Sequence, residues 1–203
     1  MKSFLYTLFI CSILISCGSN EKKSAFEGEV MNEHPTAPVG TIPDQSIYML
    51  TDSFQTQNNE KIILKQFAGK PTVIGMIFTH CDYACPRLTA DIKNINKVLN
   101  AEEGKVNYVL ISFDTERDTP DVLKKYADNL RLGNDYTLLH GSEEAVRTLS
   151  ILLNVQFQKD AEGNFSHSNI ISVLDKEGLL VSQKEGLEAN HDLSIASLKG
   201  MLK

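Results

Sequence analysis

Two cysteines and a histidine are the residues of this sequence most suited to chemistry. Cys81 and Cys85 lie in the segment 78–86 (FTHCDYACP) with three residues between them, after an apolar run and before a helical pattern. In a helix, residues four positions apart lie on one face, so the two sulfur atoms could converge on a single ion. Both would lie near a helix N-terminus, where we expect the helix dipole to lower the thiol pKa and favour the thiolate.

The spacing of the cysteine pair argues against a thioredoxin-type disulfide oxidoreductase. Such enzymes place two residues between their cysteines and face the pair with a cis-proline, whereas the last of the six prolines here is Pro120. His167, in the segment 165–168, could face the cysteines instead. Two thiolates and one imidazole suit copper, because soft sulfur selects Cu(I) and imidazole also allows Cu(II). Zinc is the alternative ion, although structural zinc usually has four ligands and no fourth is evident.

Alternating strand and helix signals surround these residues. Apolar runs predict buried strands over 71–79 and 106–113. Asp118 is expected to cap the helix that Pro120 opens, and Asp114 to be a turn residue. The other predicted elements are strand-like pieces over 46–54 and 61–67, a strand over 136–139, helices over 88–102, 142–153 and 192–202, and a hairpin of strands over 168–174 and 179–183. This order predicts an α/β fold, a thioredoxin-like sandwich with a central mixed sheet flanked by helices.

The N-terminal segment is expected to export and tether the domain. Residues 1–16 combine Lys2 with an apolar stretch, as in a signal peptide, and the stretch is too short for a permanent transmembrane helix. Cys17 follows at once, which resembles the lipobox of bacterial lipoproteins, where this cysteine is lipidated; the alternative is plain signal cleavage. Residues 17–41 are polar and are expected to form a flexible tether to a domain over 42–203.

Composition narrows the function classes further. The chain has 203 residues, 42% hydrophobic and 23% charged, as expected for one globular domain with a sizeable core. Its net charge of −6 and the lack of a basic run argue against nucleic acid as a partner. Once Cys11 and Cys17 are assigned to the export segment, only Cys81 and Cys85 remain, which disfavours a peroxidase. A disulfide between these two would close too small a loop to stabilise the fold much, so we expect a chemical role.

Three segments together resemble the Sco/SenC family, thioredoxin-like copper proteins of the cell envelope that help to build the binuclear CuA centre of cytochrome c oxidase. They are 78–81 (FTHC) with the second cysteine and its following proline, 111–120 (ISFDTERDTP), and His167 ahead of an apolar strand. The resemblance implies that Cys81, Cys85 and His167 are the ligands of one copper ion per chain.

The sequence also departs from many members of that family. Asp82 and Tyr83 follow the first cysteine where many relatives have Pro-Asp, and Ser166 stands before the histidine where several have Asp. Neither departure removes a ligand. The change before His167 could alter how the imidazole is oriented or how copper is handed on.

The resemblance implies a copper-binding accessory protein, lipid-anchored to a bacterial membrane with its domain facing the periplasm. It would deliver copper to, or prepare, the CuA site of a terminal oxidase; nitrous-oxide reductase is a second candidate recipient, and periplasmic thiol–disulfide proteins are expected partners. Two alternatives stay open. One is a thiol–disulfide reductase in which Cys81 and Cys85 keep the CuA cysteines reduced, and the other is a copper or redox sensor.

The remaining histidines and one tyrosine receive smaller roles. His80 is expected to be structural or to lie beside the metal site, because as the neighbour of Cys81 it has little freedom to share one ion. Tyr83 is a candidate docking residue next to the site. His34 is expected to be solvated in the tether, and His140 and His191 are assigned no role.

Overall fold

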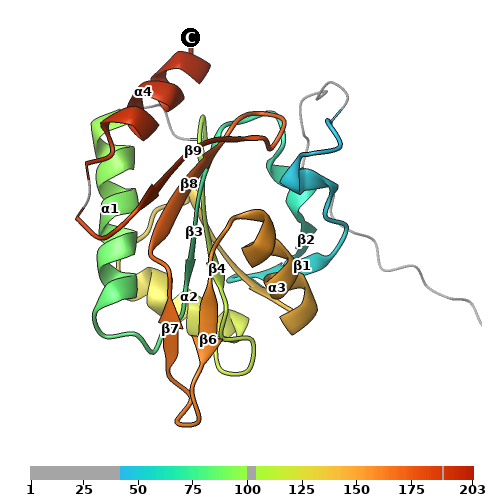
Figure 1. Cartoon of the computed structure of the whole chain (residues 1–203), viewed down its shortest axis with the longest axis vertical. Coiled ribbons are helices and arrows are strands. Elements are labelled where there is room, and N and C mark those ends of the chain that lie inside the picture. The colour runs from blue at the N-terminus through green and yellow to red at the C-terminus, as the bar shows by residue number, and fades with distance from the viewer. Residues whose placement is uncertain (1–41, 100–103, 189) are drawn as a thin grey trace, which may run out of the picture. The chain divides into compact units, whose positions relative to one another are not determined.

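The structure is a computed structural model of the chain, and it describes residues 42–99, 104–188 and 190–203 (Figure 1). The predicted signal peptide, Cys17 with its predicted lipid, the predicted tether and His34 lie outside the described residues. Within these ranges, no helix combines the length and the apolar character needed to cross a bilayer. Export and lipid anchoring therefore stay predictions.

A seven-stranded mixed sheet forms the centre of the domain (Figure 1). The strand order is β2-β1-β5-β4-β3-β8-β9, with β4 parallel to both β3 and β5 and the other neighbours antiparallel. The strands are β1 (Ser53–Thr56), β2 (Lys61–Ile63), β3 (Thr72–Ile77), β4 (Asn107–Ser112), β5 (Tyr136–Gly141), β8 (Ile170–Leu174) and β9 (Leu180–Glu185). The predicted central mixed sheet is confirmed.

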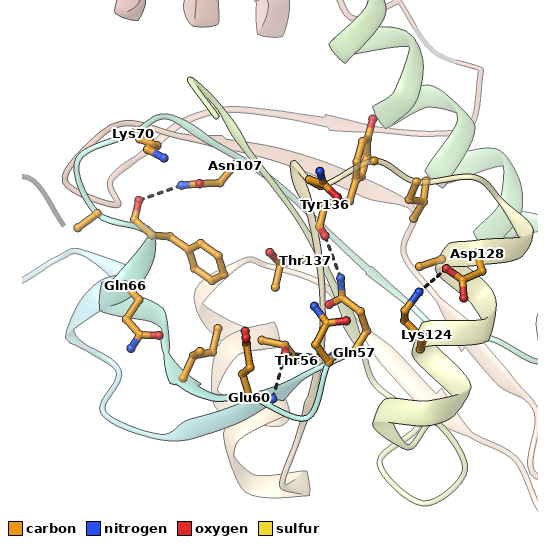
Figure 2. A pocket seen from close by; sticks show the side chains of 18 of the residues that line it. Thr56, Gln57, Glu60, Gln66, Lys70, Asn107, Lys124, Asp128, Tyr136 and Thr137 are labelled. Atoms are coloured by element: carbon orange, nitrogen blue, oxygen red, sulfur yellow. Dashed lines mark hydrogen bonds and ion pairs between the residues drawn. The ribbon is translucent and has the colours of Figure 1, made fainter. Parts of the chain in front are cut away.

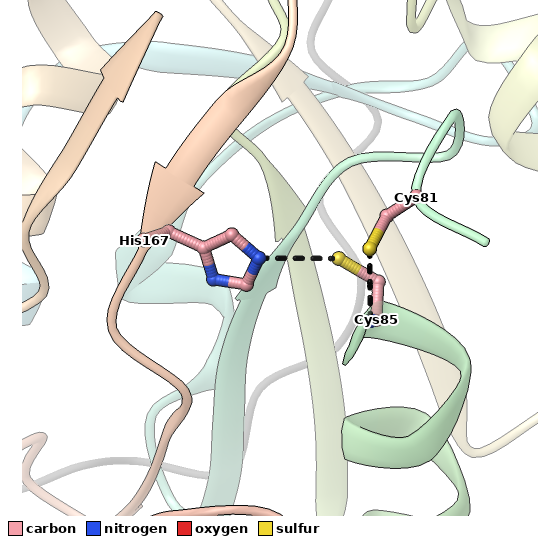
Figure 3. A group of neighbouring side chains, drawn as sticks. All are labelled: Cys81, Cys85 and His167. Atoms are coloured by element: carbon pink, nitrogen blue, oxygen red, sulfur yellow. Dashed lines mark hydrogen bonds between the residues drawn. The ribbon is translucent and has the colours of Figure 1, made fainter. Parts of the chain in front are cut away.

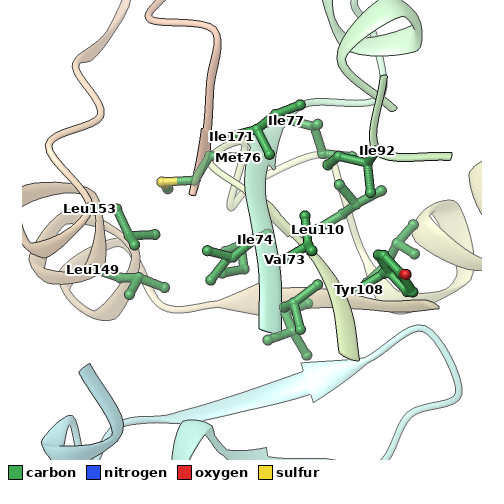
Figure 4. Close-up of a cluster of buried hydrophobic side chains, with 14 of the residues drawn as sticks. Val73, Ile74, Met76, Ile77, Ile92, Tyr108, Leu110, Leu149, Leu153 and Ile171 are labelled. Atoms are coloured by element: carbon green, nitrogen blue, oxygen red, sulfur yellow. The ribbon is translucent and has the colours of Figure 1, made fainter. Parts of the chain in front are cut away.

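Helices flank the sheet on both faces. Thr89 of α1 hydrogen-bonds the Tyr126 hydroxyl of α2 at 3.1 Å, and α1 also packs against α4. Leu149 of α3 and Leu153 just after it lie on the side of β3 opposite to Ile92 of α1 (Figure 4). The helices are α1 (Ala84–Leu99), α2 (Pro120–Asn129), α3 (Glu143–Leu152) and α4 (Asp192–Met201), with short 3-10 turns η1 (Ile47–Met49) and η2 (Leu64–Phe67). The four α-helices confirm the predicted ones, with shifts at their ends.

The hydrophobic core includes β3, the strand that precedes the cysteine loop. Every residue of β3 is buried, as the apolar run over 71–79 predicted for a strand covered on both faces. Every residue of β8, which was predicted only as a strand of a hairpin, is buried as well. Gly75 allows the close approach of α1, because a Cβ there would lie 3.2 Å from Ile92 Cδ1 and 3.3 Å from Leu88 Cδ2. The N-terminal end of α1 is thereby set against a rigid strand.

A small second sheet was not expected. β6 (Phe157–Lys159) pairs antiparallel with β7 (Phe165–His167), so His167 lies on a strand of its own and not in a lead-in to β8. Strands of three half-exposed residues have too little alternation to show a period of two. The available signal was the turn segment 160–164 (DAEGN), in which Gly163 adopts a φ of +84°.

Candidate metal centre

The cysteine pair lies where β3 runs into α1. Cys81 is half-buried in the loop after β3, and Cys85, the second residue of α1, is fully buried. The Cys85 backbone N–H donates to Cys81 Sγ at 3.4 Å, and the Phe78 N–H donates to Cys85 Sγ at 3.3 Å. Both thiols are free. The structure therefore places two sulfur atoms side by side at the N-terminal end of a helix.

The protonation of Cys85 differs from the sequence-based expectation. Burial raises the pKa of its thiol well above the ordinary value, and the neighbouring Cys81 and Asp118 act in the same direction. The hydrogen bond from the Phe78 N–H lowers the pKa but does not offset burial. The prediction that the helix end would favour the Cys85 thiolate is wrong, because desolvation outweighs the dipole. A bound cation would take the place of the proton and supply the missing positive charge.

His167 brings the third donor atom from a distant part of the chain (Figure 3). Its Nε2 lies 3.8 Å from Cys85 Sγ, and its Nδ1 lies 3.1 Å from the Ser168 carbonyl oxygen. A carbonyl oxygen only accepts, so Nδ1 carries the proton and the Nε2 lone pair faces the sulfur atoms. The donor atoms of Cys81, Cys85 and His167 all lie within 4.8 Å of one another, a grouping that could hold a metal ion.

Aromatic rings pack against one side of the histidine. The His167 ring lies edge-on to Phe78 at 5.9 Å and packs on Phe113 at 5.0 Å between centroids. Phe113 in turn stacks on Phe157 at 5.1 Å and contacts Phe165 at 5.0 Å. Phe78 and Phe113 directly follow β3 and β4, and Phe157 and Phe165 lie on β6 and β7. The wall fixes the imidazole plane and lowers the local dielectric constant, which strengthens any charge interaction at the donors.

Asp118 was expected to cap α2, and this prediction is wrong. Thr119 occupies the N-cap position, and its side chain makes no capping hydrogen bond. The fully buried Asp118 carboxylate instead accepts hydrogen bonds from the Thr79 N–H at 2.8 Å, the Thr79 hydroxyl at 2.5 Å and the Ser112 hydroxyl at 2.6 Å. It therefore stabilises the loop that carries Cys81. No local sequence signal distinguishes this long-range role from a cap.

His80 and Tyr83 lie beside the donor atoms but not among them. The exposed His80 ring lies 3.6 Å from Asp118, and His80 groups with Asp114 and Asp118 and not with the cysteines. Tyr83 is 63% exposed, and the Arg87 guanidinium covers its ring at 3.7 Å. The docking role of Tyr83 stays a prediction. Asp114 accepts a hydrogen bond from the Arg117 N–H in a turn, as predicted.

A hollow of about 660 Å³ lies at the opposite end of the sheet, where β4 and β5 begin (Figure 2). Two of its polar side chains are bonded to the protein itself: the Gln57 amide donates to the Tyr136 carbonyl oxygen at 3.0 Å, and the Asn107 amide donates to the Phe67 carbonyl oxygen at 3.0 Å. Gln66 Oε1, which is buried there, has no hydrogen-bond partner among the described residues. None of Cys81, Cys85 and His167 lines it. The hollow therefore plays no part in the candidate metal centre.

Comparison with known proteins gives the chain a family. The family model of SCO1/SenC matches residues 45–203. The curated SCO1 protein homolog of Bacillus subtilis is 27% identical over 143 residues, which cover 67% of this chain and 72% of the relative.

Solved structures agree with this match. ScoI of Bradyrhizobium japonicum with copper bound has a TM-score of 0.64 and 27% identity, covering 74% of this chain and 96% of its own. BsSco, described as a member of the Sco family of cytochrome c oxidase assembly proteins with a disulfide switch, also has a TM-score of 0.64 and 27% identity, covering 74% and 90%. The predicted thioredoxin-like α/β fold is thereby confirmed. The segments 78–86 and 111–120, the fold and these matches agree, and the chain belongs to the SCO1/SenC family.

Proposed function

We propose that this chain binds one copper ion through Cys81 Sγ, Cys85 Sγ and His167 Nε2 and delivers it to, or prepares, the CuA site of a terminal oxidase. The observation that carries the proposal is the convergence of these donors within 4.8 Å from segments more than 80 residues apart in sequence. The bound copper of the Bradyrhizobium ScoI structure and the oxidase-assembly role given to BsSco support it.

The donor set suits a protein that must hold copper and also release it. Two sulfur atoms alone retain Cu(I), whereas the imidazole adds the borderline nitrogen that Cu(II) accepts. Cys85 is buried and Cys81 is half-buried, so a recipient's thiol or imidazole would reach the ion from the Cys81 side. The proposal includes the lipid anchor at Cys17 and a periplasm-facing domain, in which case the site would lie close to a membrane-bound recipient.

The first experiment compares copper retention by the reduced full chain in detergent with that of two histidine variants. We expect one copper ion per wild-type chain and a thiolate-to-Cu(II) absorption band. His167→Ala should lose the band and bind Cu(II) more than about 100-fold more weakly, beyond the usual effect of losing an outer partner. His80→Ala is the matched control, because His80 adjoins Cys81 but lies outside the donor group, and it should keep the band.

Unchanged Cu(II) retention in His167→Ala would contradict this ligand set. Wild-type protein that retains zinc in preference to copper would contradict the choice of metal. Loss of the band in His80→Ala as well would mean that the donor group has been chosen wrongly. Each result can be obtained from the same absorption and metal-analysis measurements.

The adjacency of the two free thiols also favours a second candidate function, that of a thiol–disulfide reductase. In that reaction Cys81 and Cys85 would form a disulfide, and their two protons and two electrons would reduce a partner's disulfide to two thiols. His167→Ala separates the two functions. It should abolish copper transfer to a CuA-domain acceptor while leaving reduction of the oxidised acceptor within about twofold of wild type, because imidazole is a donor only in copper binding.

A further inference from the structure

One loop contacts both halves of the candidate metal centre. The segment 114–118 follows β4 and leads to α2, and it lies between the loop that carries Cys81 and the β6–β7 hairpin that carries His167. We call the segment 114–118 the bracket. None of its residues is among the three donors.

The first end of the bracket holds the cysteine side. Asp118 is fully buried, and its carboxylate accepts hydrogen bonds from the Thr79 N–H and hydroxyl and from the Ser112 hydroxyl. Thr79 lies two residues before Cys81. A buried carboxylate with several donors is a strong tie, because removing a donor leaves an unsatisfied charge.

The second end of the bracket holds the histidine side. Arg117 Nη2 donates to the Gly163 carbonyl oxygen in the hairpin turn at 2.5 Å, while Arg117 Nε pairs with the buried Asp114 carboxylate. The carboxylate fixes the direction of the guanidinium, which then reaches the hairpin as a rigid fork. Gly163 suits this turn because its φ of +84° is a backbone conformation that other residues rarely adopt.

An exposed ion pair adds a weaker tie at the same end. Lys159 of β6 donates to the Glu116 carboxylate at 2.6 Å, and the Glu116 side chain is 75% exposed. In the part of the chain that the structure describes, β6 and β7 pair only with each other and not with the central sheet. The position of His167 therefore depends on aromatic packing and on these polar ties.

We propose that Asp118 and Arg117 are positioning residues that set the distance between the cysteine pair and His167, Asp118 by fixing the Cys81 loop and Arg117 by fixing the hairpin. The inference rests on the proposed copper site for its functional consequence. Its structural part stands without metal, because every contact of the bracket is made by the protein alone.

The two ends of the bracket should affect the two oxidation states of copper differently. Loosening the hairpin moves the imidazole and so weakens Cu(II) more than Cu(I), which two sulfur atoms can retain. Loosening the Cys81 loop moves a sulfur atom and so weakens both ions. A residue that only stabilised the fold would leave both affinities of the folded chain unchanged.

The test uses the full chain in detergent and the variants Arg117→Ala, Glu116→Ala and Asp118→Asn. Lys124→Ala is the matched control, since it removes a cation from an exposed pair with Asp128 in α2. Two quantities are measured: amide hydrogen exchange of residues 157–167 without copper, and the affinities for Cu(I) and Cu(II) by chelator competition. Circular dichroism verifies that each variant is folded.

We expect Arg117→Ala to accelerate hairpin exchange about tenfold, the equivalent of one charge-assisted hydrogen bond. Its Cu(II) affinity should fall about tenfold, with less than about a threefold change for Cu(I). Glu116→Ala should accelerate hairpin exchange about twofold, as for an exposed ion pair. Asp118→Asn should weaken both ions about equally, and Lys124→Ala should change neither measurement.

Hairpin exchange in Arg117→Ala that stays within about twofold of wild type would overturn the proposal. Equal weakening of Cu(I) and Cu(II) binding in Arg117→Ala would overturn it as well. If Arg117→Ala does not fold, Arg117→Lys decides the matter, because it keeps the cation but not the guanidinium fork that reaches Gly163. Hairpin exchange in Arg117→Lys within about twofold of wild type would then overturn the proposal. Wild-type protein that binds no copper would instead contradict the proposed function. The hairpin exchange would still show whether the bracket holds the hairpin in place.

Discussion

The cysteine side and the histidine side of the candidate metal centre differ in how deeply their elements are buried. Cys85 follows a strand whose six residues are all buried, and it lies in the first turn of a sixteen-residue helix. His167 ends a three-residue strand in a separate two-stranded sheet, with residues that are exposed or half-buried. Buried elements open only with global unfolding, whereas small exposed hairpins open at lower free energy. The site therefore combines a fixed pair of sulfur atoms with an imidazole that can be moved.

The aromatic cluster is what the two sides share, so removing its central ring should have the largest effect. Phe113 is nearly fully buried and contacts Phe78, Phe157, Phe165 and His167. We expect Phe113→Ala to lower the free energy of unfolding by about 3–5 kcal/mol, measured by urea denaturation.

A sharper form of this prediction separates the two sides. Hairpin amides in Phe113→Ala should exchange faster by a larger factor than amides of β3, since β3 keeps its other covering residues. Phe157→Leu is the milder control, because it keeps most of the apolar volume at the edge of the cluster. Equal acceleration of amide exchange in β3 and in the hairpin would show that the cysteine side and the histidine side open as one unit and do not differ in rigidity.

The buried Cys85 thiol on the cysteine side should make the free energy of unfolding depend on pH, with an effect of intermediate size. The pKa of Cys85 is raised in the folded chain, so at high pH the unfolded chain loses this proton first. Stability is unaffected below the ordinary thiol pKa of about 9 and falls as the pH rises above it. Between pH 9 and 10 the metal-free, reduced chain should lose about 1 kcal/mol through this group.

This slope is measured by denaturant unfolding at several pH values, with Cys85→Ala as the comparison. The loss between pH 9 and 10 should be absent from the variant, whatever its overall stability. Above pH 10 the buried tyrosines Tyr48, Tyr108, Tyr126 and Tyr136, whose pKa values are also raised by burial, should destabilise both chains alike. An unchanged slope in Cys85→Ala would refute the assignment to this thiol.

The smallest effect is expected at the outer edge of the hairpin. The Arg147 guanidinium lies 5.0 Å from the Phe157 ring centroid, and its side chain is 56% exposed. Arg147→Met should weaken hairpin closure by about 0.5–1 kcal/mol, the size of an exposed cation–π contact, seen as faster exchange of β6 amides. Arg147→Lys keeps a cation, so its β6 amides should exchange at a rate between those of wild type and Arg147→Met. No change in Arg147→Met would mean that this face of Phe157 contributes nothing to hairpin closure.

Sequence reasoning succeeded best where one physical signal dominated. The unbroken apolar run over 71–79 leads to a strand buried on both faces, and α1 follows the predicted helical period. It failed where signals were short or competed. The three-residue strands of the hairpin carry no usable period, and a capping carboxylate before Pro120 cannot be told from one that reaches across to Thr79.

The residue types at the site, their order along the chain and the alternation of strands and helices can be predicted from the sequence, because each depends on local composition and spacing. The sequence also indicates Cys81, Cys85 and His167 as the candidate ligands. The folded chain was needed to show that these three donors meet, that burial raises the pKa of Cys85 and that Arg117 reaches Gly163. Each of those facts depends on segments distant in sequence, and desolvation and long-range contacts leave no periodic trace in the chain.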